Sequence, residues 1–291
     1  MMVRMEICQS IESFRQILAD ARRDGRTIGL VPTMGNLHAG HASLIARAAA
    51  DGHFAAVTIF VNPTQFGPGE DFARYPRTPE EDLELCRRHG AAAVFMPTVE
   101  EMYGEKGLTT VHIAGLTAGL CGRSRVGHFD GVCTVVAKLF NIAQPDAAYF
   151  GQKDAQQCAV IAQMVRDLNF PLRMVICPTV RESDGLAISS RNRYLASEER
   201  SQAAQLHAAL QLAQTMVLQG VTDAAALVAA VREHLASRAP LGAIEYVEIV
   251  NPQTLAPVQQ VDRPALAALA VRFGGARLID NVLLEPARSN R

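Results

Sequence analysis

The sequence lacks the features that mark several classes of protein. It has no excess of either charge, because 28 basic side chains stand against 29 acidic ones for a net charge of -1. Nucleic-acid-binding proteins usually carry a basic excess. No apolar run reaches the roughly 18 residues of a membrane helix, and the opening MMVRMEICQS contains no secretory hydrophobic segment. These absences predict a soluble cytoplasmic protein that binds neither nucleic acid nor membrane.

Cysteine pairs and two familiar catalytic motifs are also missing. The six cysteines form no CxxC pair, which argues against a compact zinc site and favours reduced, buried thiols. GxSxG, GxxxxGKS and GxxxxGKT do not occur, so neither a serine-hydrolase elbow nor a P-loop is expected. What remains is a composition of 49% hydrophobic and 20% charged residues, typical of a soluble globular protein.

Short apolar runs alternate with helical patterns over most of the first two thirds of the chain. The runs lack polar alternation, as strands buried on both faces do; they span residues 27–31, 55–61, 91–96, 147–150 and 173–177. Apolar residues at helical spacing lie between them. This alternation predicts an α/β fold, a Rossmann-like doubly wound parallel sheet whose ligands bind at the carboxyl ends of the strands.

The composition changes after about residue 184. Residues 197–237 are rich in Ala, Leu and Gln, and Ser197 is a candidate helix cap with acidic residues in the first turn. Three strands are then predicted at 244–250, 266–273 and 277–284, the last after a Gly-Gly turn. We therefore predict a catalytic domain over residues 1–184 and a smaller α+β domain over 185–291.

The segment MGNLHAGH at residues 34–41 follows the first long buried run and enters a helical pattern. Gly35 and Gly40 let the backbone approach a ligand, and a helix N-terminus offers N–H groups to phosphate. His38 and His41 are three residues apart, so they share a helix face and could bind phosphate oxygens or a metal. Two histidines on a helix surface without a function would show the same spacing, but the preceding predicted strand and the flanking glycines favour a ligand site.

Two further segments follow predicted strands in the same way. FVNPTQF places Asn62 and Gln65 beside a proline turn, where neutral amides suit a small polar substrate; an ordinary Asn-Pro turn explains it equally well. GQKDAQQ places Lys153 where it could neutralise charge on a phosphoryl group, with Gln157 one turn beyond. A solvated Lys-Asp pair is the alternative.

Two polar, basic segments complete the set. TVRESDGLAISSRN contains Ser189, Ser190 and Arg191, which could clamp phosphate because a guanidinium binds its oxygens bidentately. A polar interdomain linker is the alternative. CGRSRVGHFDG at residues 121–131 is rich in Gly and Arg and precedes a helix, so it is another candidate for anion binding.

Together, these segments and their order resemble the pantothenate synthetase (pantoate–β-alanine ligase) family. The resemblance runs from about residue 27 to 194. It implies a Rossmann-like ATP domain with the C-terminal domain as a lid, a homodimer, and a place in coenzyme A biosynthesis. The implied AMP-forming reaction has two steps. The carboxylate of (R)-pantoate attacks the α-phosphorus of Mg-ATP to give pantoyl adenylate and pyrophosphate, and the amine of β-alanine then expels AMP.

The resemblance also implies roles for individual residues. His38, His41, Lys153 and Arg191 would supply catalytic charge or donors, with His41 as proton donor. Asn62, Gln65 and Gln157 would hold pantoate or β-alanine. ATP would contact Met34, Gly35, Asn36, Leu37, His38, Ala39, Gly40, His41, Gly151, Gln152, Lys153, Asp154, Val180, Ile188, Ser189, Ser190 and Arg191. No dedicated protein cage for Mg²⁺ is expected, since phosphate and water hold most of its coordination sites.

Three positions depart from the family pattern. Gln152 replaces the usual Glu, Ile188 the usual Met and Val126 a common Pro. We expect the Gln152 side chain to hydrogen-bond locally and to fix the turn that aims Lys153. Two rival functions are a nucleotidyltransferase acting on a phosphorylated substrate and a non-catalytic nucleotide-sensing or tRNA-binding relative. Neutral Gln65 and Gln157 disfavour the first, and the near-zero net charge disfavours the second.

Overall fold

The computed structural model describes residues 5–70, 72–105 and 107–286. The chain forms two compact units: unit 1 is Met1–Ala114, Arg125–Gly151 and Val160–Pro178, and unit 2 is Gly115–Ser124, Gln152–Ala159 and Thr179–Arg291. The sequence predicted one boundary at residues 184 and 185. The structure instead places the last boundary between Pro178 and Thr179, and it adds two earlier segments to unit 2, because they pack on its sheet.

Unit 1 is built on a six-stranded parallel sheet in the order β1-β4-β3-β2-β5-β6. The strands are β1 (Glu6–Cys8), β2 (Ile28–Thr33), β3 (Phe54–Ile59), β4 (Ala93–Phe95), β5 (Ala147–Gly151) and β6 (Arg173–Cys177). The helices are α1 (Ile11–Arg23), α2 (Ala39–Ala50), α3 (Pro79–Arg88), α4 (Val99–Tyr103), α6 (His128–Ala143) and most of α7 (Ala155–Asp167), with short turns η1 (Pro63–Gln65) and η2 (Phe72–Arg74). The predicted doubly wound parallel sheet is confirmed; β1 was not predicted.

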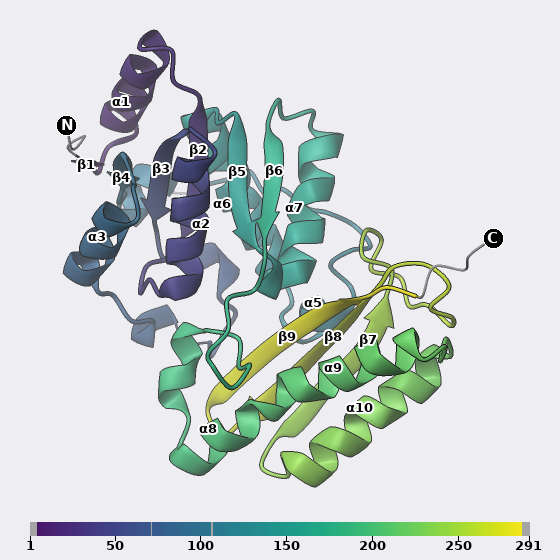
Figure 1. The fold of residues 1–291 in the computed structure, drawn as a ribbon. Coiled ribbons are helices and arrows are strands. Elements are labelled where there is room, and N and C mark those ends of the chain that lie inside the picture. The colour runs from purple at the N-terminus through teal and green to yellow at the C-terminus, as the bar shows by residue number, and fades with distance from the viewer. Residues whose placement is uncertain (1–4, 71, 106, 287–291) are drawn as a thin grey trace. The chain divides into compact units, whose positions relative to one another are not determined.

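Helices cover both faces of this sheet (Figure 1). Val94 of β4 belongs to the apolar cluster under α2 and α3, whereas the next residue, Phe95, stacks on Phe14 of α1 at 4.7 Å. Successive residues of a strand point to opposite faces, so α1 and α2 lie on opposite sides. Because β2 pairs in parallel with β3 and β5, the segments leaving these three strands start from one edge of the sheet.

Unit 2 contains the antiparallel sheet β7-β8-β9. Its strands are β7 (Ala243–Val250), β8 (Ala265–Phe273) and β9 (Ala276–Leu284), and its helices are α5 (Leu120–Ser124), α8 (Ser197–Ala203), α9 (Gln205–Leu218) and α10 (Ala224–Arg238), with turns η3 (Gln152–Asp154) and η4 (Ser190–Tyr194). The three predicted strands are confirmed. Ser197, predicted as a cap, is instead the first residue of α8, and Glu199 accepts the N–H of the preceding Ala196 at 2.9 Å.

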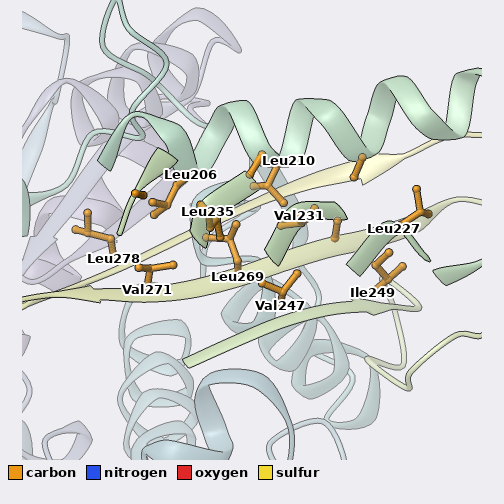
Figure 2. Packing of buried hydrophobic residues seen from close by; sticks show 14 of the residues in the cluster. Leu206, Leu210, Leu227, Val231, Leu235, Val247, Ile249, Leu269, Val271 and Leu278 are labelled. Atoms are coloured by element: carbon orange, nitrogen blue, oxygen red, sulfur yellow. The ribbon is translucent and has the colours of Figure 1, made fainter. Parts of the chain in front are cut away.

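The core of unit 2 lies between its sheet and two long helices. Figure 2 shows apolar side chains of α9 and α10 packed against those of the strands. Leu210 of α9, Val231 of α10 and Leu269 of β8 are almost completely buried, and side chains of this size each stabilise a fold by about 1.5–3 kcal/mol when buried. Among the described residues, no helix is long and apolar enough to cross a bilayer.

Candidate active site

The first predicted segment joins β2 to α2 through two histidines. His38 is the N-cap of α2: its Nδ1 accepts the N–H of Gly40 at 3.1 Å, and Nδ1 of His41 accepts the N–H of His38 at 3.3 Å. The ring centroids are 4.1 Å apart, so the rings are neighbours, as the HxxH spacing predicted. Because each Nδ1 is an acceptor, a neutral ring carries its proton on Nε2. Both imidazoles are thus arranged as Nε2–H donors, which suit phosphate oxygens.

Gly40 has a structural role that was not predicted. A Cβ at Gly40 would lie 2.9 Å from Cε1 of His38, so a side chain there would push the His38 ring out of its capping position. The Gly40 N–H, expected to be open to phosphate, is the donor that His38 accepts. Gly40 therefore leaves room for the His38 imidazole, whether or not a ligand also approaches the backbone there.

A buried carboxylate holds the loop that precedes the histidines. Asp82 of α3 is 2% exposed, and it accepts the N–H of Asn36 at 2.9 Å and that of Leu37 at 2.7 Å. The loop needs this support because Gly35 and Asn36 both have positive φ, 84° and 49°, a conformation that is costly outside glycine. Asp82 was missed from the sequence, because PEED at the start of a helix looks like ordinary first-turn acid.

The second predicted segment forms a buried group of amides at η1. Asn62 donates from Nδ2 to Oε1 of Gln65 at 3.2 Å, and its Oδ1 accepts the hydroxyl of Tyr103 at 2.7 Å. Nε2 of Gln65 lies 2.9 Å from Sδ of Met34, so the second segment contacts the first. Burial raises the pKa of Tyr103, which keeps its phenol protonated as a donor. The Asn-Pro turn therefore carries an ordered, uncharged and buried polar cluster.

The arginines of the fifth segment are bound to carboxylates. In unit 1, Arg125 forms a bidentate ion pair with Glu70, with both N–O distances at 2.7 Å. The Arg125 hydrogen bonds hold the pKa of Glu70 below its usual range. His128 accepts from Arg125 at 2.9 Å and, through Nδ1, donates to the carbonyl of Gln65 at 2.8 Å. In unit 2, Arg123 pairs with Glu248 at 3.0 Å. Arg125 therefore supports the Gln65 turn instead of offering an open guanidinium to an anion.

In unit 2, the third predicted segment forms the turn η3 at the start of α7. Nε2 of Gln152 donates to Oδ1 of Asn281 in β9 at 3.0 Å. The expected local hydrogen bond of Gln152 is therefore wrong; its partner is 129 residues away in sequence. Lys153 makes no side-chain hydrogen bond or ion pair within the part of the chain that the structure describes, so its ammonium is available for a ligand.

The two adjacent glutamines of this segment have different surroundings. Gln156 is buried; its Oε1 accepts the N–H of Cys121 at 2.9 Å, and its Nε2 donates to the carbonyls of Leu116 and Gly119. Gln157 is partly exposed and has no such contacts among the described residues. Gln156 thus has a structural role, and Gln157 is the glutamine with amide groups left for a substrate.

The fourth predicted segment is a small hairpin followed by η4. Ile188 donates its N–H to the carbonyl of Val180 at 3.0 Å, which places these two predicted ATP contacts side by side. Ser189 caps η4 by accepting the N–H of Arg191 at 3.3 Å. Arg181 forms a bidentate ion pair with Asp280 of β9, at 2.6 and 2.9 Å. The segment is therefore an ordered, fastened hairpin, unlike a plain linker.

Each unit thus brings some predicted residues together. Unit 1 joins His38 to His41, and Gln65 to Met34 and Asn62. The predicted residues after Gly151 all belong to unit 2. Across the described residues, no group of three or more His, Cys, Asp or Glu side chains is placed to hold a metal ion. Sequence reasoning missed Asp82, Tyr103 and Asn281, whose polar roles arise from contacts between distant segments.

Comparisons with known proteins show which family the chain resembles along its length. A relative from Moorella thermoacetica named pantothenate synthetase is 53% identical over 281 residues, covering 97% of this chain and 99% of that protein. The pantothenate synthetase structure from Thermus thermophilus matches with a TM-score of 0.92 and 45% identity, covering 97% of this chain and 100% of the other. A pantoate–β-alanine ligase from Francisella tularensis, complexed with β-γ ATP and β-alanine, matches with a TM-score of 0.77 and 31% identity, covering 98% and 100%.

The family model described as pantoate-beta-alanine ligase matches residues 6–283, nearly the whole chain. With this match and relatives at about 50% identity, the chain belongs to the pantoate–β-alanine ligase family of enzymes.

Proposed function

We propose that this enzyme condenses pantoate with β-alanine in two steps. Pantoate carboxylate attacks the α-phosphorus of ATP and releases pyrophosphate; the amine of β-alanine then attacks the acyl carbon and releases AMP. Adenylation is needed because a free carboxylate oxygen is a poor leaving group. The observation that carries the proposal is the histidine pair, whose hydrogen bonds direct both imidazole protons to Nε2.

The residues divide the work by charge. His38, His41, Lys153 and Arg191 would meet the phosphates and stabilise charge that develops during transfer, the dominant contribution in phosphoryl chemistry. Binding of ATP and β-alanine by the Francisella tularensis ligase supports both substrates for this chain. Mg²⁺ would enter as part of the substrate Mg-ATP, which needs few protein ligands.

The pantoate end of the site is proposed to be neutral. Asn62 links the amide of Gln65 to the phenol of Tyr103 through hydrogen bonds, so a hydroxy acid would meet uncharged side chains here. Arg125 contacts the Gln65 carbonyl at 3.5 Å, but Glu70 neutralises it with two hydrogen bonds. A phosphorylated substrate would call for an unpaired cation here, so these contacts disfavour the rival nucleotidyltransferase function.

The test is the substrate dependence of each product. Pyrophosphate should form from Mg-ATP and pantoate alone, whereas AMP should require β-alanine as well. Formation of AMP without pantoate would contradict the adenylate mechanism. Pyrophosphate formed only with a phosphorylated alcohol would support the rival function.

Three further expectations from the resemblance stay predictions. We propose that the enzyme is a homodimer, that unit 2 acts as a lid, and that it works in the cytoplasm, where its six free cysteines would remain reduced. Sedimentation measures the first, and hydrogen exchange with and without Mg-ATP measures the second. Fractionation of the native cells measures the third.

A further inference from the structure

Strand β9 carries two consecutive buried polar residues in an otherwise largely apolar stretch. Asp280 is 3% exposed and Asn281 is 5% exposed. Burial of such groups is costly unless their hydrogen bonds are satisfied. Two apolar residues would serve the sheet equally well, so the polar pair calls for a purpose beyond packing. Consecutive strand residues point to opposite faces, and the two side chains indeed contact different segments.

Asn281 holds the turn that carries Lys153. Its Nδ2 donates to the carbonyls of Gln152 at 2.9 Å and Lys153 at 3.0 Å, and its Oδ1 accepts from the side chain of Gln152. Both amide hydrogens and the amide oxygen are therefore used on one three-residue turn. This fixes the backbone of Lys153 itself, and hence the direction in which its side chain leaves the turn.

Asp280 holds the hairpin that leads into the Ser189–Arg191 segment. Its carboxylate binds both terminal nitrogens of Arg181, and Arg181 also donates to the carbonyl of Gly185 at 3.1 Å. The hairpin continues into η4, where Asn192 donates to the carbonyl of Ala187 at 3.1 Å. Loss of the ion pair between Asp280 and Arg181 would therefore release the hairpin that precedes Arg191.

We propose that Asp280 and Asn281 are positioning residues that hold two ATP-binding segments through one strand. Asn281 acts through Lys153, and Asp280 acts through Arg181 on the Arg191 segment. The inference rests on the proposed function, in which Lys153 and Arg191 contact the phosphates. Neither β9 residue needs to touch the substrate: a shift of about 1 Å in a charged group is enough to slow a reaction by an order of magnitude or more.

Double-mutant cycles test this division of work. Asn281→Ala should lower kcat for pantoate-dependent pyrophosphate release by about tenfold or more. In a Lys153→Ala background it should lower kcat by less than about twofold, because the group it positions is already gone. In an Arg191→Ala background its full effect should remain. Asp280→Asn should show the reverse pattern, with its effect lost beside Arg191→Ala and retained beside Lys153→Ala.

A second variant separates positioning from loss of packing. Asn281→Asp keeps the side-chain volume but places a carboxylate against the two carbonyl oxygens. A buried carboxyl is protonated more readily than an exposed one, and once protonated it regains one donor. Its activity relative to the wild type at the same pH should therefore rise as pH is lowered from about 8 to about 6. A general defect in folding would show no such recovery.

The matched control is Asn251→Asp in the same unit. Asn251 uses Oδ1 to accept the N–H groups of Gln253 and Thr254, and an aspartate preserves both bonds, so activity should stay unchanged. Every variant is first checked by circular dichroism and thermal melting. Effects of Asn281→Ala and Asp280→Asn that simply multiply with both partner variants would overturn the proposal. Wild-type protein that releases no pyrophosphate with pantoate would instead contradict the proposed function.

Discussion

The two units hold their candidate residues in place by contacts of different range. In unit 1, His38 binds His41 and Asn62 binds Gln65, each three residues along the chain. In unit 2, Asn281 reaches Gln152 across 129 residues and Asp280 reaches Arg181 across 99. When interacting residues lie close together in the sequence, the motif itself shows both partners. When a supporting residue lies far away in the sequence, the motif can be recognised but its support cannot.

Unit 1 also shows where local support ends. Asp82 reaches Asn36 across 46 residues, and Tyr103 reaches Asn62 across 41. These contacts fasten the two segments to α3 and α4, which their local hydrogen bonds do not do. Hydrogen bonds between residues close in sequence therefore orient the individual side chains, and hydrogen bonds between distant residues hold the segments that carry them.

The largest expected effect tests whether the pair His38 and His41 takes part in catalysis. His41→Ala should lower pantoate-dependent pyrophosphate release by at least about 10²-fold, the usual result of losing a transition-state donor. The fold should survive, because Leu44, Ile45 and Ala48 still bury the inner face of α2. The measurement pairs kcat with a thermal melt, and exposed His89 supplies the control variant His89→Ala. Activity within about threefold of wild type would assign His41 to structure alone.

The next effect tests the distant support in unit 1. Asp82→Ala should destabilise the protein by about 2–3 kcal/mol, because the N–H groups of Asn36 and Leu37 lose a charged acceptor. The KM for ATP should rise more than the KM for pantoate, since the freed loop leads into the histidines. Urea unfolding and substrate titrations measure both quantities. The control Glu81→Ala, at an exposed residue one position earlier on α3, should change neither the stability nor the KM for ATP. Equal effects of the two variants would show that Asp82 does not support the histidine loop.

The same contrast explains what could be predicted from the sequence. The parallel sheet was predictable because buried strands such as β3 read as continuous apolar runs, and the histidine pair because its spacing matches a helical turn. Gln157 was singled out by its place one turn beyond Lys153 and by the resemblance, but the structural role of Gln156 was not predictable, since only packing shows that it binds backbone groups. Asp82 stands where an acidic residue in the first turn of a helix is ordinary, and the strand predicted over 277–284 gave no role to Asp280 or Asn281. The missing information lay in tertiary contacts.

Acidification should weaken the two units over different pH ranges. Burial, followed by the charge of Arg181, lowers the pKa of His207 in unit 2 from its ordinary 6.5. The unfolded chain therefore binds this proton first, and stability falls as pH drops below 6.5. In unit 1, Arg125 lowers the pKa of Glu70 from 4.5. The Glu70 carboxylate contributes fully to stability above pH 4.5, and this contribution is lost as the pH falls through the lower pKa of Glu70 in the folded protein.

Native-state hydrogen exchange at a series of pH values measures this difference, because it reports on peptides from each unit separately. Peptides of unit 2 should lose protection first on acidification, and His207→Gln should delay that loss. Glu70→Gln should lower protection of unit 1 at neutral pH and flatten its dependence on pH in strong acid. Simultaneous loss of protection in both units, unchanged by His207→Gln, would contradict the assignment.

The smallest expected effect concerns Gln152, where most relatives are expected to carry glutamate. Glutamate would be a possible acid or metal ligand, but here Nε2 of Gln152 donates to Asn281. Gln152→Glu removes this one donor and leaves both Asn281 bonds to the carbonyls of the turn in place. The backbone of Lys153 should therefore stay where it is. We expect kcat/KM to change by less than about tenfold, equivalent to about 1.4 kcal/mol of barrier.

Lys153→Ala, assayed beside it, sets the scale for losing the charge that the turn carries, a loss of about 10²-fold or more. A small change in Gln152→Glu with a large one in Lys153→Ala assigns position 152 to geometry. If Gln152→Glu instead gains about 10²-fold in pantoate-dependent pyrophosphate release, a carboxylate at this position is catalytic. The long-range hydrogen bond to Asn281 would then hold a glutamine that replaces a catalytic glutamate, and Gln152 would differ from its relatives in chemistry and not in structure alone.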